Sequence, residues 1–227
     1  MRRLGLSLFS HRTLAVARWD LHFIRIRFTN VLRNSQRKAQ RFIASRSKPV
    51  YVNLGSGPRG IDDPHWINVD GFDARNVHFV LDFNRPLPFA DASLDGVFCE
   101  HVLEHFSLAD GERLMREVRR CLRPGAAGRL IVPDASRVIQ MYFSNPEELV
   151  ERRLGRQGTA MEAVNSLFRQ HYEHQFLYDW TTLNLMLERA GFRKISRSTF
   201  GTGDLCPALV LDDPKYEWES LYVEVQK

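Results

Sequence analysis

Cysteine is scarce in this 227-residue chain, and its three cysteines stand far apart at Cys99, Cys121 and Cys206. The sequence has no Cys-x-x-Cys pair and no group of histidines at metal-ligand spacing, so we expect neither a disulfide framework nor a metal site. The longest apolar run of the N-terminal part is Leu14 to Ala17, far short of a signal-peptide core or a membrane span. These absences favour a protein of the reducing cytosol.

Positive charge is concentrated at one end of the chain. The formal net charge is +5, but residues 1–48 carry twelve basic residues and one acidic residue, which leaves the remainder mildly acidic. From Leu14 to Val31 apolar residues recur in steps of three and four, which predicts a helix with an apolar face and a basic face. Such a helix suits three partners: the anionic surface of a membrane, the body of the protein or a second copy, and nucleic acid.

A polar segment joins this helix to the rest of the chain. Residues 34–49 are basic and rich in serine, and Pro49 ends any helix that precedes it. We therefore predict a linker there, and divide the chain into a basic arm, residues 1–48, and a domain, residues 49–227.

The domain alternates strand and helix patterns. Strands are predicted at residues 50–54, 66–70, 77–81, 94–99, 129–132, 194–198 and 221–225, and helices at 108–122 and 180–190. This alternation predicts a parallel sheet with crossover helices. Between residues 134 and 178 it gives way to helical sequence rich in Arg and Glu, which we interpret as a lid over an acceptor-binding site.

A glycine loop follows the first predicted strand. Its sequence, Gly55-Ser-Gly-Pro-Arg-Gly60, matches the dinucleotide pattern G-x-G-x-x-G, but that site also needs a full helix after the third glycine and an acid about 20 residues further on. Pro64 and Asp70 come too early for both. A ligand with a carboxylate and a ribose but no phosphates suits the loop better, and S-adenosylmethionine is such a ligand. Asp70, at a strand end, can accept both ribose hydroxyls.

Longer motifs surround this loop. They are Asn53-Leu-Gly-Ser-Gly-Pro, Trp66-Ile-Asn-Val-Asp70, the run from Leu87 to His105 that ends in Glu-His-Val-Leu-Glu-His, Leu122-Arg-Pro-Gly, Val132-Pro-Asp134, and the run from His174 to Leu183 with Ala190-Gly-Phe192. With these motifs the chain from about Val50 onward resembles the class I S-adenosylmethionine-dependent methyltransferases. More narrowly, it resembles predicted methyltransferases found with bacterial cell-surface polysaccharide genes.

The resemblance implies a Rossmann-like α/β fold, with a seven-stranded, mostly parallel sheet, flanking helices and an antiparallel last strand. It places Asp82 and Phe83 near the adenine, and Glu100 and His101 against the methionine portion of the cofactor. The full set that it implies for cofactor binding is Asn53, Leu54, Gly55, Ser56, Gly57, Asp70, Asp82, Phe83, Glu100 and His101. The short crossover after the glycine loop indicates that the helix there is reduced.

Methyl transfer from a sulfonium is an in-line displacement in which alignment dominates and a base for the hydroxyl proton adds further rate. The candidate bases are His101, His105, His171, His174 and Asp134. We favour His174, which stands in an aromatic cluster, with His101 and Asp134 as further catalytic candidates. Asp134 suits a helix cap equally well, and His105 is expected to have a structural role.

The leading hypothesis is an enzyme that O-methylates a sugar hydroxyl of a cell-surface glycan or of its lipid-linked precursor, and the glycan part rests on the resemblance. Two alternatives stay open: a methyltransferase that acts on RNA or another small molecule, and a binding protein that keeps the fold without turnover. The expected location is the cytoplasm, with residues 14–33 available to dock on the inner face of the membrane.

Overall fold

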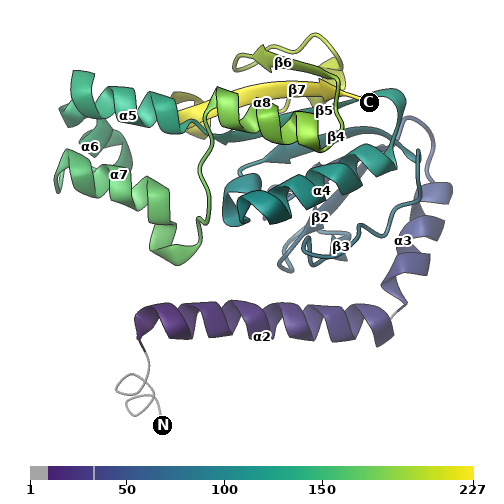
Figure 1. Cartoon of the computed structure of the whole chain (residues 1–227). Coiled ribbons are helices and arrows are strands. Elements are labelled where there is room, and N and C mark those ends of the chain that lie inside the picture. Colours follow the sequence, from purple (N-terminus) through teal and green to yellow (C-terminus); the bar gives the residue numbers. More distant parts are fainter. Residues whose placement is uncertain (1–9, 33) are drawn as a thin grey trace.

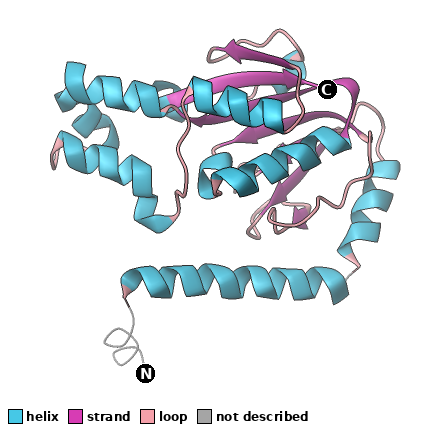
Figure 2. Ribbon diagram, in the orientation of Figure 1, coloured by secondary structure: helices cyan, strands magenta, loops and turns pink. Residues whose placement is uncertain are grey.

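The computed structural model describes residues 10–32 and 34–227, and its centre is a seven-stranded sheet of order β3-β2-β1-β4-β5-β7-β6. The strands are β1 Tyr51–Leu54, β2 Trp66–Asp70, β3 Phe79–Val80, β4 Leu94–Glu100, β5 Leu122–Pro133, β6 Lys194–Ser198 and β7 Ser220–Gln226. β1 to β5 pair in parallel, while β7 is antiparallel to both β5 and β6. The predicted α/β fold, with its antiparallel last strand, is therefore confirmed (Figure 2).

Helices cover one face of this sheet. α4 (Leu108–Cys121) and α8 (Trp180–Arg189) lie side by side on it, and α3 (Ser35–Ala44) rises along its β3 side (Figure 1). Leu114, Met115 and Val118 of α4 recur at helical spacing and are fully buried in the main core. α8 begins where Asp179 accepts a hydrogen bond from the Thr182 amide, which confirms the predicted cap.

The other face of the sheet is covered by irregular chain. Trp66, Phe98 and Leu209 belong to a second apolar cluster there. The fully buried Arg129 of β5 is paired with Asp212, which ties the segment after β6 to the sheet. A buried cation of this kind needs such a partner, since its desolvation is costly when it is left alone.

A helical group projects from one end of the sheet. It contains α5 (Ala135–Ser144), α6 (Pro146–Leu154) and α7 (Ala160–Arg169), followed by the 3-10 turn η2 (Gln170–Tyr172) (Figure 1). Val138, Leu149, Ala163 and Leu167 form a small core of its own. This group follows β5 directly, and α8 returns the chain to the sheet.

Three local predictions were wrong. The expected linker contains the helix α3, because Ala39, Phe42 and Ile43 have helical spacing and pack on the main core. The third strand is only Phe79–Val80, since it pairs with β2 over a short register. β5 starts at Leu122, although a break was expected at Pro124 and Gly125.

The N-terminal helix α2 (His11–Leu32) is present as expected, and the structure shows which of its sides meets the body. Ile26 is buried, and Trp19 and Phe23 face the body, where Trp19 packs edge-on against Phe72. Most of the apolar stripe predicted from the sequence is exposed instead: Leu21, Ile24, Phe28 and Val31 are 56 to 79% exposed.

The described helices lack long apolar stretches. Within residues 10–32 and 34–227, every helix is too short or too polar to cross a membrane. Cys99 and Cys121 are buried as free thiols, and Cys206 is half-buried and free.

Candidate active site

A cavity of about 1100 Å³ opens at the carboxyl ends of β1, β2 and β4. The strand order reverses between β1 and β4, and ligands of open α/β sheets bind at such a point. Five groups of residues line it. They are Gly55, Asp70, Gly71 and Phe72 at the ends of β1 and β2; Phe83 and Asn84 after β3; His101, Val102, His105 and Phe106 after β4; Val16, Trp19, Asp20 and Phe23 of α2; and residues 169, 170 and 172–175 opposite. Its volume exceeds that of an ordinary single-ligand pocket and leaves room for a cofactor and an acceptor.

The glycine loop and Asp70 form one rim of the cavity. Gly55 has a φ of 79°, and a Cβ there would lie 2.1 Å from the Val102 side chain, so only glycine fits this turn. The Asp70 carboxylate accepts hydrogen bonds from the Gly57 amide at 2.7 Å and the Phe72 amide at 2.8 Å. Each carboxylate oxygen keeps a further lone pair for a ribose hydroxyl, so these residues fit the predicted cofactor.

Other predicted cofactor residues lie at different distances from the cavity. Phe83 lines it, whereas Asn53 and Leu54 are buried in the sheet beneath it. Ser56 is buried, and its hydroxyl has no partner in the described part of the chain. Asp82 is also buried; it is not among the lining residues and is paired with Arg27 of α2. The ion pair anchors α2 to the segment after β3, and the adenine contact of Asp82 stays a prediction.

Glu100, the last residue of β4, and His101, the residue after it, have different surroundings. Glu100 is not a lining residue; its carboxylate accepts a hydrogen bond from the Asp213 amide at 3.0 Å, and burial raises its pKa. His101 lines the cavity and has a φ of 52°. Its Nδ1 lies 3.1 Å from Glu104 Oε1, and its Nε2 lies 3.0 Å from the Ser220 hydroxyl. Burial alone would lower the pKa of His101, but the hydrogen bond and the charge of Glu104 outweigh it and raise that pKa.

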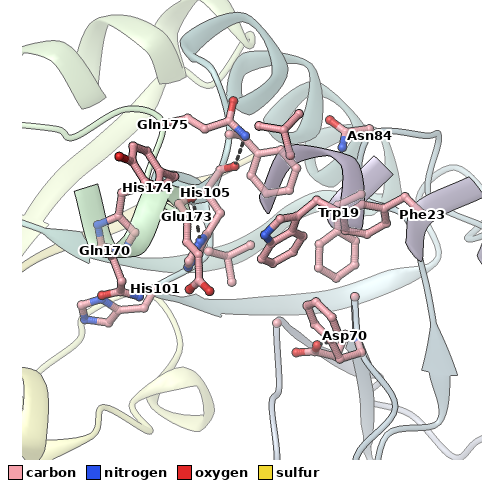
Figure 3. A pocket seen from close by; sticks show the side chains of 18 of the residues that line it. Trp19, Phe23, Asp70, Asn84, His101, His105, Gln170, Glu173, His174 and Gln175 are labelled. Atoms are coloured by element: carbon pink, nitrogen blue, oxygen red, sulfur yellow. Dashed lines mark hydrogen bonds between the residues drawn. The ribbon is translucent and has the colours of Figure 1, made fainter. Parts of the chain in front are cut away.

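His174 and His105 meet at the opposite wall, with ring centroids 5.0 Å apart (Figure 3). His174 is 9% exposed, and its Nδ1 lies 2.6 Å from the Leu167 carbonyl oxygen. Burial lowers the pKa of His174 to about 4, so its ring is neutral at pH 7. A carbonyl can only accept, so Nδ1 carries the hydrogen and Nε2 keeps a lone pair.

Two other candidate bases lie away from the cavity. Asp134 is the N-cap of α5: its Oδ1 accepts hydrogen bonds from the amides of Ser136 and Arg137, and it is not among the lining residues. The structure thus realises the cap, which is one of the two roles the sequence left open for it. His171 is exposed and is likewise not a lining residue.

Sequence reasoning missed two parts of the site. Trp19 and Phe23 of α2 form a wall of the cavity, which Figure 3 shows on the side of Asp70. The helical pattern did reveal them as apolar, but not which face would meet the body. Glu104 is 1% exposed, its Oε2 is without a hydrogen-bond partner among the described residues, and it lies beside His105 and His174. Chain order did not reveal this group, because His174 is far from Glu104 in sequence.

Comparison with known proteins agrees with this geometry. Residues 66–132, which run from the start of β2 to the next-to-last residue of β5, match a family model described as a methyltransferase domain. The match covers less than half of the chain. A search of curated proteins found no significant match.

Solved structures of similar fold include an S-adenosylmethionine-dependent methyltransferase from Archaeoglobus fulgidus (14% identity, 86% of this chain and 94% of that one, TM-score 0.48). Another comes from Thermotoga maritima (17% identity, 93% and 95%, TM-score 0.49). A third is phosphoethanolamine N-methyltransferase 2 from Haemonchus contortus, solved with S-adenosylmethionine (14% identity, 86% and 52%, TM-score 0.49). At these TM-scores the likenesses carry no conclusion about this chain.

The class of the protein follows from the domain match together with the sheet order and the cavity at its switch point. The match over residues 66–132 indicates a methyltransferase domain, and the glycine loop with Asp70 suits S-adenosylmethionine as its cofactor. The acceptor molecule and the atom that receives the methyl group are the subject of a proposal.

Proposed function

We propose that this methyltransferase methylates a hydroxyl oxygen, and that the acceptor is a sugar of a cell-surface glycan or of its lipid-linked precursor. The observation that carries the proposal is the shared cavity, in which Asp70 lies on one side and His101, His105 and His174 lie on the other. The sequence resemblance supports the glycan, and the cavity wall supports an acceptor with many hydroxyls.

The acceptor side of the cavity is chemically mixed. Gln170, Glu173 and Gln175 offer amide and carboxylate groups, and Tyr172 offers an aromatic ring. Such groups can hydrogen-bond several hydroxyls while a ring covers an apolar sugar face. This segment follows α7, so we propose that residues 134–178 form the lid that selects the acceptor.

The cofactor end would be held by the glycine loop and Asp70. We propose that Gly55 and its neighbours Asn53, Leu54, Ser56 and Gly57 shape the loop, while Phe83 covers the adenine. Bound there, S-adenosylmethionine supplies a methyl group already activated by its sulfonium.

The protein itself then orients the hydroxyl. Neutral His174 can accept a hydrogen bond from it through Nε2. His101, which is hydrogen-bonded to Glu104 and Ser220, also lines the cavity, and its raised pKa favours the positively charged form of its ring. With a pKa of about 4, His174 is a weak base, so alignment rather than proton removal is its main contribution. For Asp134 we retain only an indirect role, through the start of α5.

Product analysis tests this function. The full chain is incubated with methyl-labelled cofactor and, in parallel reactions, with lipid-linked oligosaccharides or with RNA, and the products are analysed by mass spectrometry and NMR. We expect the label on a sugar oxygen, and His174→Ala should lower turnover while cofactor affinity is kept. Label on a nitrogen or on RNA, or cofactor binding without any transfer, would contradict the proposal; the last outcome indicates a binding protein.

Cofactor binding can be tested separately at Asp70. Asp70→Asn keeps the shape of the side chain but loses its charge, so we expect S-adenosylmethionine to bind more weakly by about 1.5–3 kcal/mol, the usual value for a charge-assisted hydrogen bond. Isothermal calorimetry measures the dissociation constant, and Asp62→Asn, on the exposed part of the same loop, is the matched control. Equal affinities of the Asp70 variant and the control would exclude the ribose role.

We also propose that the exposed stripe of α2 docks on an anionic membrane surface on the cytoplasmic side, where a lipid-linked acceptor would be found. Leu21, Ile24, Phe28 and Val31 are exposed together, and the exposed Arg18 and Arg25 lie along the same helix. Apolar burial combined with attraction between arginines and anionic headgroups is how such helices bind membranes.

A further inference from the structure

Three side chains with metal-binding atoms meet at one wall of the cavity. Glu104, His105 and His174 each offer a ligand atom, and these atoms lie within 4.8 Å of one another. η1 (Leu103–His105), just after β4, supplies the first two, and the segment after α7 supplies the third. From the sequence we expected no metal site. The three residues come together only when the two segments pack in the folded protein, so their spacing in the chain does not reveal the grouping.

Glu104 is the member that demands an explanation. Its side chain is 1% exposed, and one carboxylate oxygen, Oε1, is occupied by His101 at 3.1 Å. The other oxygen, Oε2, is fully buried without a hydrogen-bond partner among the described residues. A buried carboxylate oxygen left unsatisfied is costly, so a ligand for Oε2 is expected on physical grounds.

Both histidines are held in the form that binds metal. Nδ1 of His174 lies 2.6 Å from the Leu167 carbonyl, and Nδ1 of His105 lies 3.2 Å from the Glu173 carbonyl. Because each Nδ1 must donate to its carbonyl, each Nε2 is left with a free lone pair. Backbone carbonyls play this part for the ligating histidines of many metal sites, where they fix the tautomer and the ring orientation.

We infer that Glu104, His105 and His174 form a binding site for one divalent transition-metal ion at the acceptor end of the cavity. Two imidazoles and one carboxylate suit borderline ions such as Zn²⁺ or Fe²⁺ better than Mg²⁺, which prefers oxygen ligands. Separations of up to 4.8 Å require the three side chains to close slightly around an ion.

The position of the site indicates which ligand from outside the protein the ion would bind. Three protein ligands leave at least one coordination position open, and His105 and His174 both line the cavity. The open position therefore faces the acceptor, and a hydroxyl or water oxygen fits it. With the ion in place, the ion rather than His174 orients the acceptor hydroxyl and lowers its pKa.

Metal titration of the full chain tests the site. After treatment with EDTA and desalting, the protein is titrated with Zn²⁺ by calorimetry, with Co²⁺ by visible absorption, and with Mg²⁺ for comparison. We expect one Zn²⁺ per chain, Co²⁺ bands in the visible region and no competition from Mg²⁺ at equal concentration. Glu104→Gln and His105→Ala should each weaken Zn²⁺ binding at least about tenfold, since even the loss of an outer-shell partner has that effect.

The matched control is His171→Ala, an exposed histidine of the same segment that is outside the cluster. Circular dichroism and S-adenosylmethionine binding verify that each variant folds. If Glu104→Gln does not fold, His105→Ala decides the question. Zn²⁺ binding that is absent, far below one per chain, or equal in His105→Ala and the control would overturn the inference. The titration needs no acceptor and no turnover, so its failure is distinguishable from failure of the proposed function.

Discussion

Asp70 ends β2 and Asp134 directly follows β5, and the sequence suggests a functional role for both. Asp70 precedes a loop, so its carboxylate stays at the cavity rim. Asp134 directly precedes α5, and its Oδ1 accepts hydrogen bonds from the free amides at the start of that helix. The identity of a residue thus sets which bonds it can make, while the element that follows decides which ones it does make.

Glu117 illustrates how local hydrogen bonds set a pH dependence. Its two oxygens accept hydrogen bonds from Arg120 at 2.8 and 2.9 Å, and one also accepts from the Leu87 amide. The hydrogen bonds from Arg120, more than the one from Leu87, lower the pKa of Glu117. A carboxyl with a lowered folded-state pKa stabilises the protein above its unfolded pKa, and this contribution is lost as the pH falls through the folded value.

We therefore predict that Glu117→Gln lowers the free energy of unfolding at pH 7 by about 1 kcal/mol, the usual net value of a hydrogen bond. The difference from the unchanged protein should shrink as the pH falls toward 3. Urea denaturation at several pH values measures it, with Glu147→Gln on the exposed side of α6 as the control. A difference that stays constant with pH would show that Glu117 does not titrate as proposed.

At the scale of elements, α2, which belongs to the basic arm, forms part of the active site. His22 Nε2 lies 2.8 Å from the Gly71 carbonyl, Arg27 pairs with Asp82, and Asn30 donates to the Val80 carbonyl. All three partners belong to the β2–β3 edge of the cavity. The helix is thus fixed on the body by polar contacts, and Trp19 and Phe23 complete the cavity wall.

This arrangement predicts that Trp19→Ala weakens ligand binding although residue 19 lies outside the matched domain. Removing the indole opens the wall and takes away apolar contact, so we expect the dissociation constant for S-adenosylmethionine or the KM for the acceptor to rise roughly tenfold, about 1.4 kcal/mol. Leu21→Ala, on the exposed side of the same helix, should change neither constant. If both variants behave alike, α2 is not part of the binding site.

At the scale of the whole molecule, the charge is divided between a basic arm and a mildly acidic body. α2 exposes its apolar stripe on the side away from the cavity wall, so one helix presents two apolar surfaces. Docking of the outer surface on a membrane would leave the inner one in place. The arm can therefore serve the active site and a membrane at the same time.

The membrane proposal is tested by sedimentation with vesicles of phosphatidylglycerol and phosphatidylcholine. We expect the full chain to bind the anionic vesicles, and the double variant Ile24→Glu, Phe28→Glu to bind at least about tenfold more weakly, since burial of each side chain contributes about 1.5–3 kcal/mol. Leu211→Glu, which changes an exposed apolar residue elsewhere, is the matched control. Equal sedimentation of the full chain and of residues 47–227 would contradict the proposal, and concentration-dependent dimers would assign the stripe to a second copy.

The sequence by itself determined the sheet, most of its strands, the glycine turn and Asp70, because these depend on local periodicity and on residues with few conformational choices. The number of strands and the antiparallel last strand came from the resemblance, and the structure confirms both.

Only the tertiary structure decided which face of α2 is buried, since that helix is apolar on both sides and periodicity cannot choose between them. It likewise packed α3 (Ser35–Ala44) of the expected linker on the main core, paired Asp82 with Arg27, and brought His174 to Glu104 and His105. These outcomes depend on contacts between residues far apart in the chain, whose energies no local pattern contains.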